Sequence, residues 1–237
     1  FGPGRGTMMR DALRAARIVP GFLAALRVHL VEMSGVLKNA QEQALKDSGA
    51  PVTWGQNLAG YGAPAIVVAN EFLDAWPVEQ WVKTEHGWRL RGVGLDRRGE
   101  LDFVALGQSQ ATELDEKYPA APVGAVAERQ RPERLAEAFK HVALSGPIAA
   151  IVIDYGHVGD VTGDTLQAVR DHRHEHPLTS PGEADVSAQV SFFDLASALH
   201  AAGLAIDGPV TQAEFLGRLG VVERTARLMA ANPQRAG

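Results

Sequence analysis

The 237-residue sequence contains no cysteine. A disulfide framework, a thiolate nucleophile and a metal site built on cysteine sulfur are therefore excluded. No apolar run approaches the roughly 18 residues needed to cross a bilayer, and no signal peptide is recognisable. We expect no membrane span.

An excess of positive charge is also missing. The formal net charge is -5, and no basic stretch is interleaved with aromatic residues, so a nucleic-acid partner is not favoured. Arginine outnumbers lysine, 18 to 5 among the 23 basic residues, and alanine is abundant, as in GC-rich bacterial genomes. This composition favours a bacterial cytoplasmic protein, with the mitochondrial matrix as the eukaryotic counterpart.

The first residues lack both an initiating methionine and a preceding strand. They read Phe1-Gly2-Pro3-Gly4-Arg5-Gly6-Thr7, and a helical pattern follows at once. In doubly wound α/β folds such a turn follows a strand, so we expect the chain to be a catalytic domain without its N-terminal part.

Gly2, Gly4 and Gly6 form a G-x-G-x-G pattern. Glycine tolerates positive φ and allows close backbone approach, and a helix N-terminus directs N–H groups into the turn. Dinucleotide folds use G-x-G-x-x-G, whereas this spacing is typical of S-adenosylmethionine (SAM) turns. An ordinary glycine-rich loop remains the alternative.

Glu32 ends a short apolar run over residues 27–32 and lies 26 positions after Gly6. An acidic residue at the end of the second strand of such a fold can accept hydrogen bonds from both ribose hydroxyls. The alternative is a solvated carboxylate at a strand end.

Two unbroken apolar runs, residues 65–69 and 148–153, predict central parallel strands buried on both faces. The first ends in Asn70-Glu71-Phe72-Leu73-Asp74-Ala75, and the second ends in Asp154. Because ligands of α/β folds bind outside the carboxyl ends of strands, these polar residues are candidate site residues. Turn capping and a structural carboxylate are the alternatives.

The remaining chain alternates helical and strand patterns. Helices are predicted over residues 7–17, 34–48, 132–143, 190–202 and 211–228, and further strands over 52–54 and 204–206. Residues 78–83, 88–95 and 101–106 predict an antiparallel ribbon inserted into the fold, as part of an insertion at about 77–131 whose segment 108–131 is irregular.

A polar segment over residues 159–185 carries His172, His174 and His176. Alternate histidines on a strand would share one face, but Pro177 and the nearby turn residues favour a loop, so no metal site is predicted. Asp185 is a weaker candidate for peptide binding.

Several blocks in register resemble one family, the MidA-type SAM-dependent methyltransferases, which includes the mitochondrial complex I assembly factor that methylates an arginine. The likeness runs nearly end to end. It rests on Gly2-Pro3-Gly4-Arg5-Gly6-Thr7, Glu32 with Ser34, Asn70 to Ala75, Asp154-Tyr155-Gly156, Gly163-Asp164-Thr165-Leu166, Pro181 to Val186, Gly208 to Gln212 and Phe215-Leu216. Trp76 and Val186-Ser187 depart from the family's usual residues.

The resemblance implies a Rossmann-like class I methyltransferase fold: a mostly parallel seven-stranded sheet flanked by helices, within a single domain spanning residues 1–237. It implies SAM as cofactor, held by Gly2, Gly4, Gly6, Thr7, Glu32 and Asn70, and no metal. Glu71, Asp74 and Asp154 are the candidates for holding a cationic acceptor such as arginine and accepting its proton.

A protein substrate, such as a respiratory complex subunit, is the partner that the resemblance implies, and a homodimer is possible. Three alternatives stay open: a non-catalytic assembly factor that binds its partner through the ribbon, a nicotinamide oxidoreductase, which the glycine spacing disfavours, and methylation of a small molecule.

Overall fold

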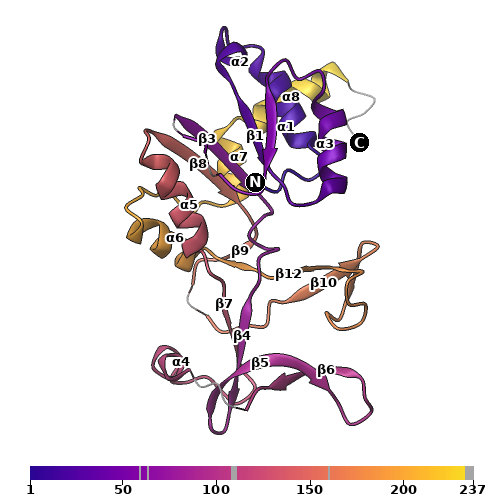
Figure 1. Ribbon diagram of the computed structural model, residues 1–237, viewed down its shortest axis with the longest axis vertical. Helices are drawn as coiled ribbons and strands as arrows, with labels where there is room; N and C mark the ends of the chain where they lie inside the picture. The colour runs from indigo at the N-terminus through magenta and orange to yellow at the C-terminus, as the bar shows by residue number, and fades with distance from the viewer. Residues whose placement is uncertain (59, 63, 108–110, 160, 233–237) are drawn as a thin grey trace. The chain divides into compact units, whose positions relative to one another are not determined.

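A computed structural model describes residues 1–58, 60–62, 64–107, 111–159 and 161–232 (Figure 1). The chain divides into two compact units, one from Phe1 to Leu204 and a smaller one that begins at Ala205. The candidate site lies in the first unit. The assignment of the whole chain to a single catalytic domain stays a prediction.

The first parallel pair consists of β1 (Val28–Val31) and β2 (Val52–Gly55). Three helices accompany it: α1 (Thr7–Ala16), α2 (Phe22–Ala25) and α3 (Gly35–Leu45). Leu13 of α1 and Leu45 of α3 are buried with Val28 and Leu30 of β1, so the apolar stripes of the two helices cover the pair. The predicted helices and strands of this region are confirmed.

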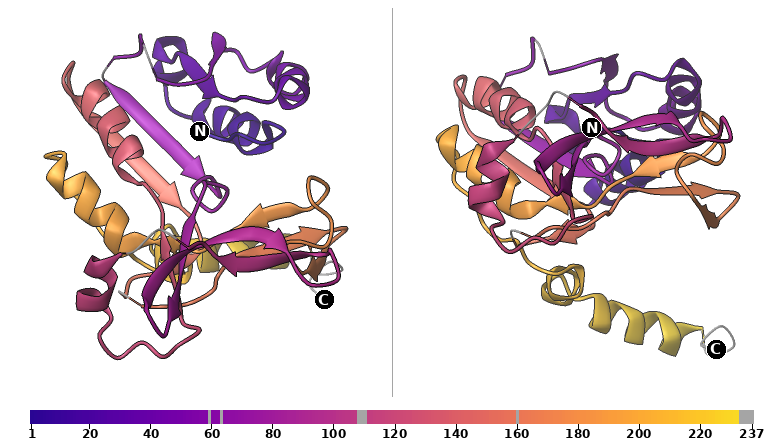
Figure 2. Two further views of the ribbon diagram at one scale, coloured as in Figure 1. Left: turned by 60° about the horizontal axis from the view of Figure 1, so that its bottom comes forward. Right: turned by 90° about the horizontal axis from the view of Figure 1, so that it is seen from below.

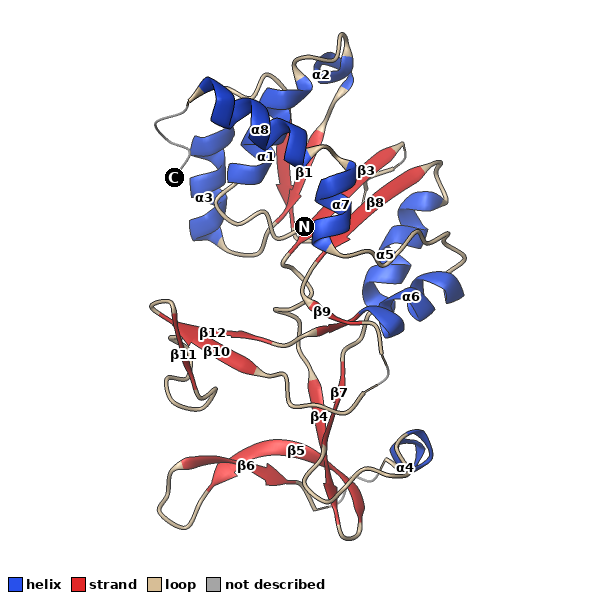
Figure 3. Cartoon of the chain, turned by 180° about the vertical axis from the view of Figure 1, so that it is seen from behind, coloured by secondary structure: helices blue, strands red, loops and turns tan. Residues whose placement is uncertain are grey.

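The second parallel pair joins β3 (Ala65–Asn70) to β8 (Ile148–Ile153) in register, from Ala65 opposite Ile148 to Asn70 opposite Ile153. These are the two strands that the apolar runs predicted, and they run side by side in Figure 2. The prediction that both faces are buried is wrong, because Ile66 (67% exposed) and Ile151 (41% exposed) lie uncovered on one face. Helices α5 (Glu133–Ala143) and α6 (Phe192–Ala201) pack on one face (Figure 3). The core there consists of Val67, Leu73, Leu135, Phe139, Val190 and Leu195.

The glycine turn lies between these two pairs. The Gly2 nitrogen donates to the Val31 carbonyl (3.2 Å), and the Phe1 nitrogen donates to the Val68 carbonyl (2.8 Å). Residues 1 and 2 therefore bond to β1 on one side and to β3 on the other.

The α/β class is confirmed, but the described residues do not form the predicted single seven-stranded sheet. They form separate parallel pairs and two antiparallel sheets. The physical reason lies at the turn, where, among the described residues, Phe1 and Gly2 alone bond to β1 and β3, too few hydrogen bonds for a ladder. A strand before the glycines stays a prediction.

The predicted ribbon is confirmed as part of a four-stranded antiparallel sheet. Its order is β6 (Leu101–Ala105), β5 (Gly87–Leu95), β4 (Glu79–Thr84) and β7 (Val126–Arg129). The segment expected to be irregular contributes β7 and the short helix α4 (Thr112–Lys117), which correct that prediction; its residues 108–110 lie outside the described chain. Trp88 of β5 is fully buried and packs with Ala111, which precedes α4, and with Ala127 of β7.

The loop expected over 159–185 contains strands instead. β10 (Gln167–Arg170) pairs antiparallel with β11 (Arg173–Glu175) and with β12 (Asp185–Ser187). Asp171 and His172 have φ values of 49° and 61°, as a two-residue hairpin turn requires. These strands were not predicted because their side chains are largely exposed and polar, so they lack the apolar pattern of a buried strand. β9 (Gly156–His157) and β13 (Val190–Ser191) form a short parallel pair.

The second unit contains α7 (Gln212–Arg218) and α8 (Val221–Ala231). The single helix predicted over 211–228 is broken at Gly220, whose φ is 81°. The strand predicted over 204–206 does not form. Within the described ranges, no helix is long and apolar enough to cross a membrane.

Candidate functional site

Each glycine of the turn has a positive φ: 51° for Gly2, 54° for Gly4 and 78° for Gly6. A Cβ on Gly2 would lie 2.9 Å from Phe72 Cδ2, and one on Gly6 would lie 3.3 Å from Gln41 Cα. A Cβ on Gly4 would meet nothing within 4 Å. Gly2 and Gly6 thus pack against the protein, whereas the backbone of Gly4 borders open space. Gly6 is the N-cap of α1, whose first residue is Thr7.

Glu32 follows β1 and is held by backbone and side-chain donors. Its Oε1 accepts from the Ser34 nitrogen (2.8 Å), and its Oε2 accepts from Gln41 Nε2 (2.9 Å). Ser34 in turn caps α3 by accepting from the Leu37 nitrogen. The carboxylate is half-buried and fixed beside the turn, as a ribose ligand requires.

Gln41, completely buried, joins the turn to Glu32. Besides Glu32, its Nε2 donates to the Gly4 carbonyl (2.6 Å), and its Oε1 accepts from Trp54 Nε1 (2.9 Å). We call Gly4, Glu32, Gln41 and Trp54 the glycine-side cluster. Sequence reasoning missed Gln41. The available signal was its place between Leu37 and Leu45 at helical spacing, on the apolar side of α3.

Asp154, directly after β8, holds the turn that follows β3. Its Oδ2 accepts from the backbone nitrogens of Phe72 (3.1 Å), Leu73 (2.9 Å) and Asp74 (3.3 Å). These contacts are those of a structural carboxylate. Burial, and next the charge of Asp74, raise the pKa of Asp154 above its usual range, against the opposing effect of the three N–H donors.

Asp74 and Tyr155 form the second arrangement, which sequence reasoning only half found. Tyr155 Oη lies 2.7 Å from Asp74 Oδ2 and 2.8 Å from Ser187 Oγ. The other oxygen, Asp74 Oδ1, is buried and has no hydrogen-bond partner in the described chain. Burial, the largest cause, together with Asp74 raises the pKa of Tyr155, so the phenol remains a donor. We call Asp74, Asp154 and Tyr155 the aspartate-side cluster.

Asn70 and Glu71 stand at the end of β3. Asn70 is the last residue of the strand and pairs with Ile153. Glu71 is exposed, its nitrogen donates to the Ile153 carbonyl (2.8 Å), and its φ is 47°. A non-glycine residue in the left-handed region costs about 1 kcal/mol or more, and such residues are enriched at functional sites.

Residues 187–190, which we call the strap, run along the aspartate-side cluster. The Ala188 nitrogen donates to the Asp74 carbonyl (2.9 Å) and the Val190 nitrogen to the Tyr155 carbonyl (3.0 Å). A Cβ on Gly156 would lie 1.9 Å from the Val190 carbonyl oxygen. The glycine of Asp154-Tyr155-Gly156 is therefore needed for the close approach of the strap.

The two clusters are neighbours through Phe72. The Phe72 ring approaches Gly2, and the Phe72 nitrogen bonds Asp154. The structure thus brings the predicted glycines, Glu32, Asp74 and Asp154 to the carboxyl ends of β1, β3 and β8. This is the geometry expected of a ligand site in an α/β fold.

Residues 1–210 match the model of a protein family described as "Putative S-adenosyl-L-methionine-dependent methyltransferase". The chain belongs to this family. SAM is the cofactor that defines the family.

Named relatives and solved structures agree with this assignment. The chain is 31% identical to "Protein arginine methyltransferase NDUFAF7, mitochondrial" of Danio rerio, over 98% of this chain and 60% of the relative. It is 31% identical to the Homo sapiens protein of the same name, over 97% and 57%. The chain therefore spans about 60% of the length of these relatives.

Two crystal structures of one superfamily from Burkholderia thailandensis are similar to the whole of this chain, each with a TM-score of 0.85 and 27% identity. The chain covers 65% and 63% of those two chains. The second of them is bound to S-adenosyl-homocysteine.

The donor set of this family member suits a SAM molecule. Gly4 presents open backbone at positive φ beside a helix N-terminus, and Glu32 presents a fixed carboxylate. The first N–H groups of a helix have no partner within the helix, so they suit a carboxylate. The residues present therefore fit the amino-acid and ribose parts of the cofactor.

The described part of the chain holds no group of three or more metal-ligating side chains. His174 lies on β11, whereas His176 lies beyond the strand, where its Nδ1 accepts from the Leu178 nitrogen (3.3 Å) and its ring lies 5.6 Å from that of Phe103. Asp185, the weaker peptide-binding candidate, is exposed on β12.

Proposed function

We propose that the protein transfers the methyl group of SAM to an arginine of a partner protein. The observation that carries the choice of acceptor is the unpartnered, buried Oδ1 of Asp74. A buried carboxylate oxygen without a donor is costly, and a guanidinium supplies donors in the fork that a carboxylate matches.

In this proposal the glycine-side residues bind the cofactor and the aspartate-side cluster binds the acceptor. Gly2, Gly4, Gly6 and Thr7 would hold the amino-acid end of the cofactor, and Glu32 would accept from the ribose hydroxyls, next to Asn70. Bound SAM supplies a methyl group on a positively charged sulfur that leaves as a neutral thioether. The remaining task of the protein is to orient the acceptor and exclude water.

The aspartate-side cluster orients the acceptor in this proposal. Tyr155 bonds Oδ2 of Asp74, which leaves Oδ1 as the oxygen without a donor. A guanidinium N–H that displaces the atoms covering Oδ1 would supply that donor. Glu71, an exposed acid three residues before Asp74, would accept the proton lost by the nitrogen. Asp154 keeps the backbone of residues 72–74 in place.

Relatives support the arginine acceptor, because the curated proteins at 31% identity carry the name of protein arginine methyltransferases. A respiratory complex subunit as substrate, a role in complex I assembly, a bacterial cytoplasmic location, a homodimer, a single catalytic domain and a completed seven-stranded sheet belong to the same proposal.

Calorimetric titration of the full-length protein with S-adenosyl-homocysteine tests the cofactor site. Glu32→Ala should weaken binding by about 1.5–3 kcal/mol, the scale of hydrogen bonds to a charged group. Glu42→Ala, at an exposed acid of α3, is the control and should bind as the wild type does. Absence of binding by the wild type would contradict the proposed methyltransferase activity and favour the assembly-factor alternative.

The acceptor is tested with arrays of arginine-containing peptides, labelled SAM and lysine-substituted copies of each peptide. Label confined to the arginine copies supports the proposal. Label only on small molecules of an extract would show the small-molecule alternative, and hydride exchange with a nicotinamide cofactor would show the oxidoreductase.

A further inference from the structure

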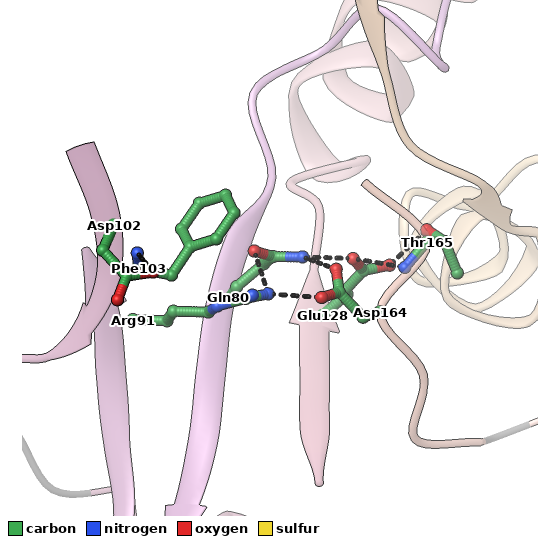
Figure 4. A network of polar contacts seen from close by, with 7 residues as sticks. All are labelled: Gln80, Arg91, Asp102, Phe103, Glu128, Asp164 and Thr165. Atoms are coloured by element: carbon green, nitrogen blue, oxygen red, sulfur yellow. Dashed lines mark hydrogen bonds and ion pairs between the residues drawn. The ribbon is translucent and has the colours of Figure 1, made fainter. Parts of the chain in front are cut away.

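A polar network connects the four-stranded antiparallel sheet to Asp164 and Thr165 (Figure 4). Gln80 of β4, which is buried, donates through Nε2 to Glu128 Oε1 (2.6 Å) and to Asp164 Oδ1 (2.9 Å). Arg91 of β5 donates to Asp164 Oδ2 (2.7 Å) and to Gln80 Oε1 (3.0 Å), and its guanidinium lies 3.9 Å above the Phe103 ring. Residues of β4, β5, β6 and β7 thus all contribute to the network.

Thr165 is the end of this network nearest to the strap. Its nitrogen donates to Glu128 Oε1 (3.0 Å) and its hydroxyl donates to Glu128 Oε2. The same hydroxyl oxygen accepts from the Gln189 nitrogen (2.9 Å). Glu128 orients the Thr165 hydroxyl, since the proton points to the carboxylate and leaves the lone pairs for the strap.

Gln189 lies within the strap, between Ala188 and Val190. Its neighbours Ala188 and Val190 donate to the backbone of Asp74 and Tyr155, and Ser187 contacts the Tyr155 hydroxyl. Three successive amides of the strap therefore bond Asp74, Thr165 and Tyr155 in turn. The contact with Thr165 links the strap, through Glu128 of β7, to the four-stranded antiparallel sheet.

We infer that Thr165, oriented by Glu128, is a positioning residue for Asp74 and Tyr155. The inference rests on the proposed function. It explains how the inserted four-stranded sheet contributes to the site, although Asp74 and Tyr155 do not belong to that sheet. A shift of the strap moves Ser187 away from the Tyr155 hydroxyl and frees Asp74 to turn. Misplacement of about 1 Å can cost a large factor in rate.

The test compares Thr165→Val, which keeps the shape but removes the hydroxyl, with Thr165→Ser, which keeps it, in the full-length protein. Thr84→Val is the matched control, because the Thr84 hydroxyl likewise donates one hydrogen bond, to the Gly87 carbonyl, and accepts one, from the His86 amide. If Thr165→Val does not fold, Glu128→Gln replaces it, and the same measurements are made on that variant.

Hydrogen exchange at the Ala188 and Val190 amides is the first measurement, and it does not depend on activity. Thr165→Val should speed this exchange about tenfold, the factor that corresponds to loss of one hydrogen bond. Thr165→Ser and Thr84→Val should exchange as the wild type does. Unchanged protection in Thr165→Val overturns the inference, even if the wild type methylates no peptide.

Kinetics on the arginine peptide that the wild type labels most is the second measurement. Thr165→Val should lower kcat about tenfold, leave the KM for SAM and the S-adenosyl-homocysteine affinity unchanged, and recover in Thr165→Ser. Equal losses of kcat and cofactor affinity would show a global defect and contradict a positioning role. A wild type that labels no peptide contradicts the proposed function, and the exchange result then decides the role of Thr165.

Discussion

The glycine-side and aspartate-side clusters lie at the same edge of the fold but differ in how their polar atoms are bonded. In the first, Gln41 uses its amide nitrogen and oxygen on Gly4, Glu32 and Trp54. In the second, Asp74 Oδ1 is left without a partner in the described chain and two groups have raised pKa values. The polar atoms of Gln41 are thus bonded within the chain, whereas Asp74 has one oxygen that, in the proposed function, accepts from the substrate.

The largest expected effect concerns the approach of the strap to the aspartate-side cluster. Gly156→Ala places a Cβ 1.9 Å from the Val190 carbonyl, so β9 and β13 must separate. We expect the free energy of unfolding to fall by about 3 kcal/mol, measured by urea denaturation. Gly35→Ala, where a Cβ would meet nothing within 4 Å, should be neutral or stabilising. Equal stability of the two variants would contradict the close approach.

Asp74→Asn separates the two clusters functionally. Replacing the carboxylate by an amide removes the charge and places a donor where the guanidinium would donate, so methyl transfer to arginine peptides should fall about 100-fold. Binding of S-adenosyl-homocysteine should stay as in the wild type, because the glycine-side cluster is intact. Asp11→Asn, at an exposed carboxylate of α1, is the control. Loss of cofactor binding in Asp74→Asn would show that the clusters are not separable.

Gln41→Leu tests the hydrogen bonding of the glycine-side cluster. It puts an apolar side chain at the fully buried position 41 and removes the partner of Trp54 Nε1 and of the Gly4 carbonyl, so we expect about 2 kcal/mol of destabilisation by thermal unfolding. Cofactor affinity should also fall, about tenfold, because Glu32 loses a donor. Destabilisation without any change in affinity would limit Gln41 to a role in folding.

The smallest effect is a pH dependence confined to the aspartate-side cluster. Because the pKa of Asp154 is raised in the folded chain, that chain holds the proton more tightly than the unfolded chain does. This contribution to stability is present at low pH and is lost as the pH rises through the folded pKa.

Asp154→Asn has no carboxyl to titrate and should lack this loss. As the pH increases from about 4 upward, the unfolding free energy of the variant should therefore rise relative to that of the wild type. Urea denaturation at a series of pH values measures it. Two parallel curves would mean that Asp154 titrates normally. The backbone donors of residues 72–74 can still bond the side-chain amide oxygen of this variant, which keeps the turn.

Sequence patterns predicted the parts of the site that depend on local rules. The glycines, Glu32 and the ends of the two apolar strands follow from short spacings and from the place of ligands in α/β folds. Gln41, Tyr155 and Thr165 were not predicted as site residues because their partners lie far along the chain. Gln41 bonds Gly4, Tyr155 bonds Asp74 and Thr165 bonds Gln189.

The fold was predicted best where strands are apolar. β3 and β8 are continuous apolar runs and were placed correctly, whereas β10, β11 and β12 are short and polar and were taken for a loop. The Gly220 break in the last helix was also missed, since one glycine within a helical pattern does not by itself determine where a helix ends.

The backbone of Glu71 has a consequence for engineering this protein. With φ at 47°, Glu71 occupies a conformation that glycine adopts without strain. Glu71→Gly should therefore raise thermal stability by about 1 kcal/mol. A selection for heat resistance alone would favour this replacement and, in the proposed function, remove an acid beside the reacting nitrogen. Glu71 is thus a place where directed evolution for stability and for activity would give opposite residues.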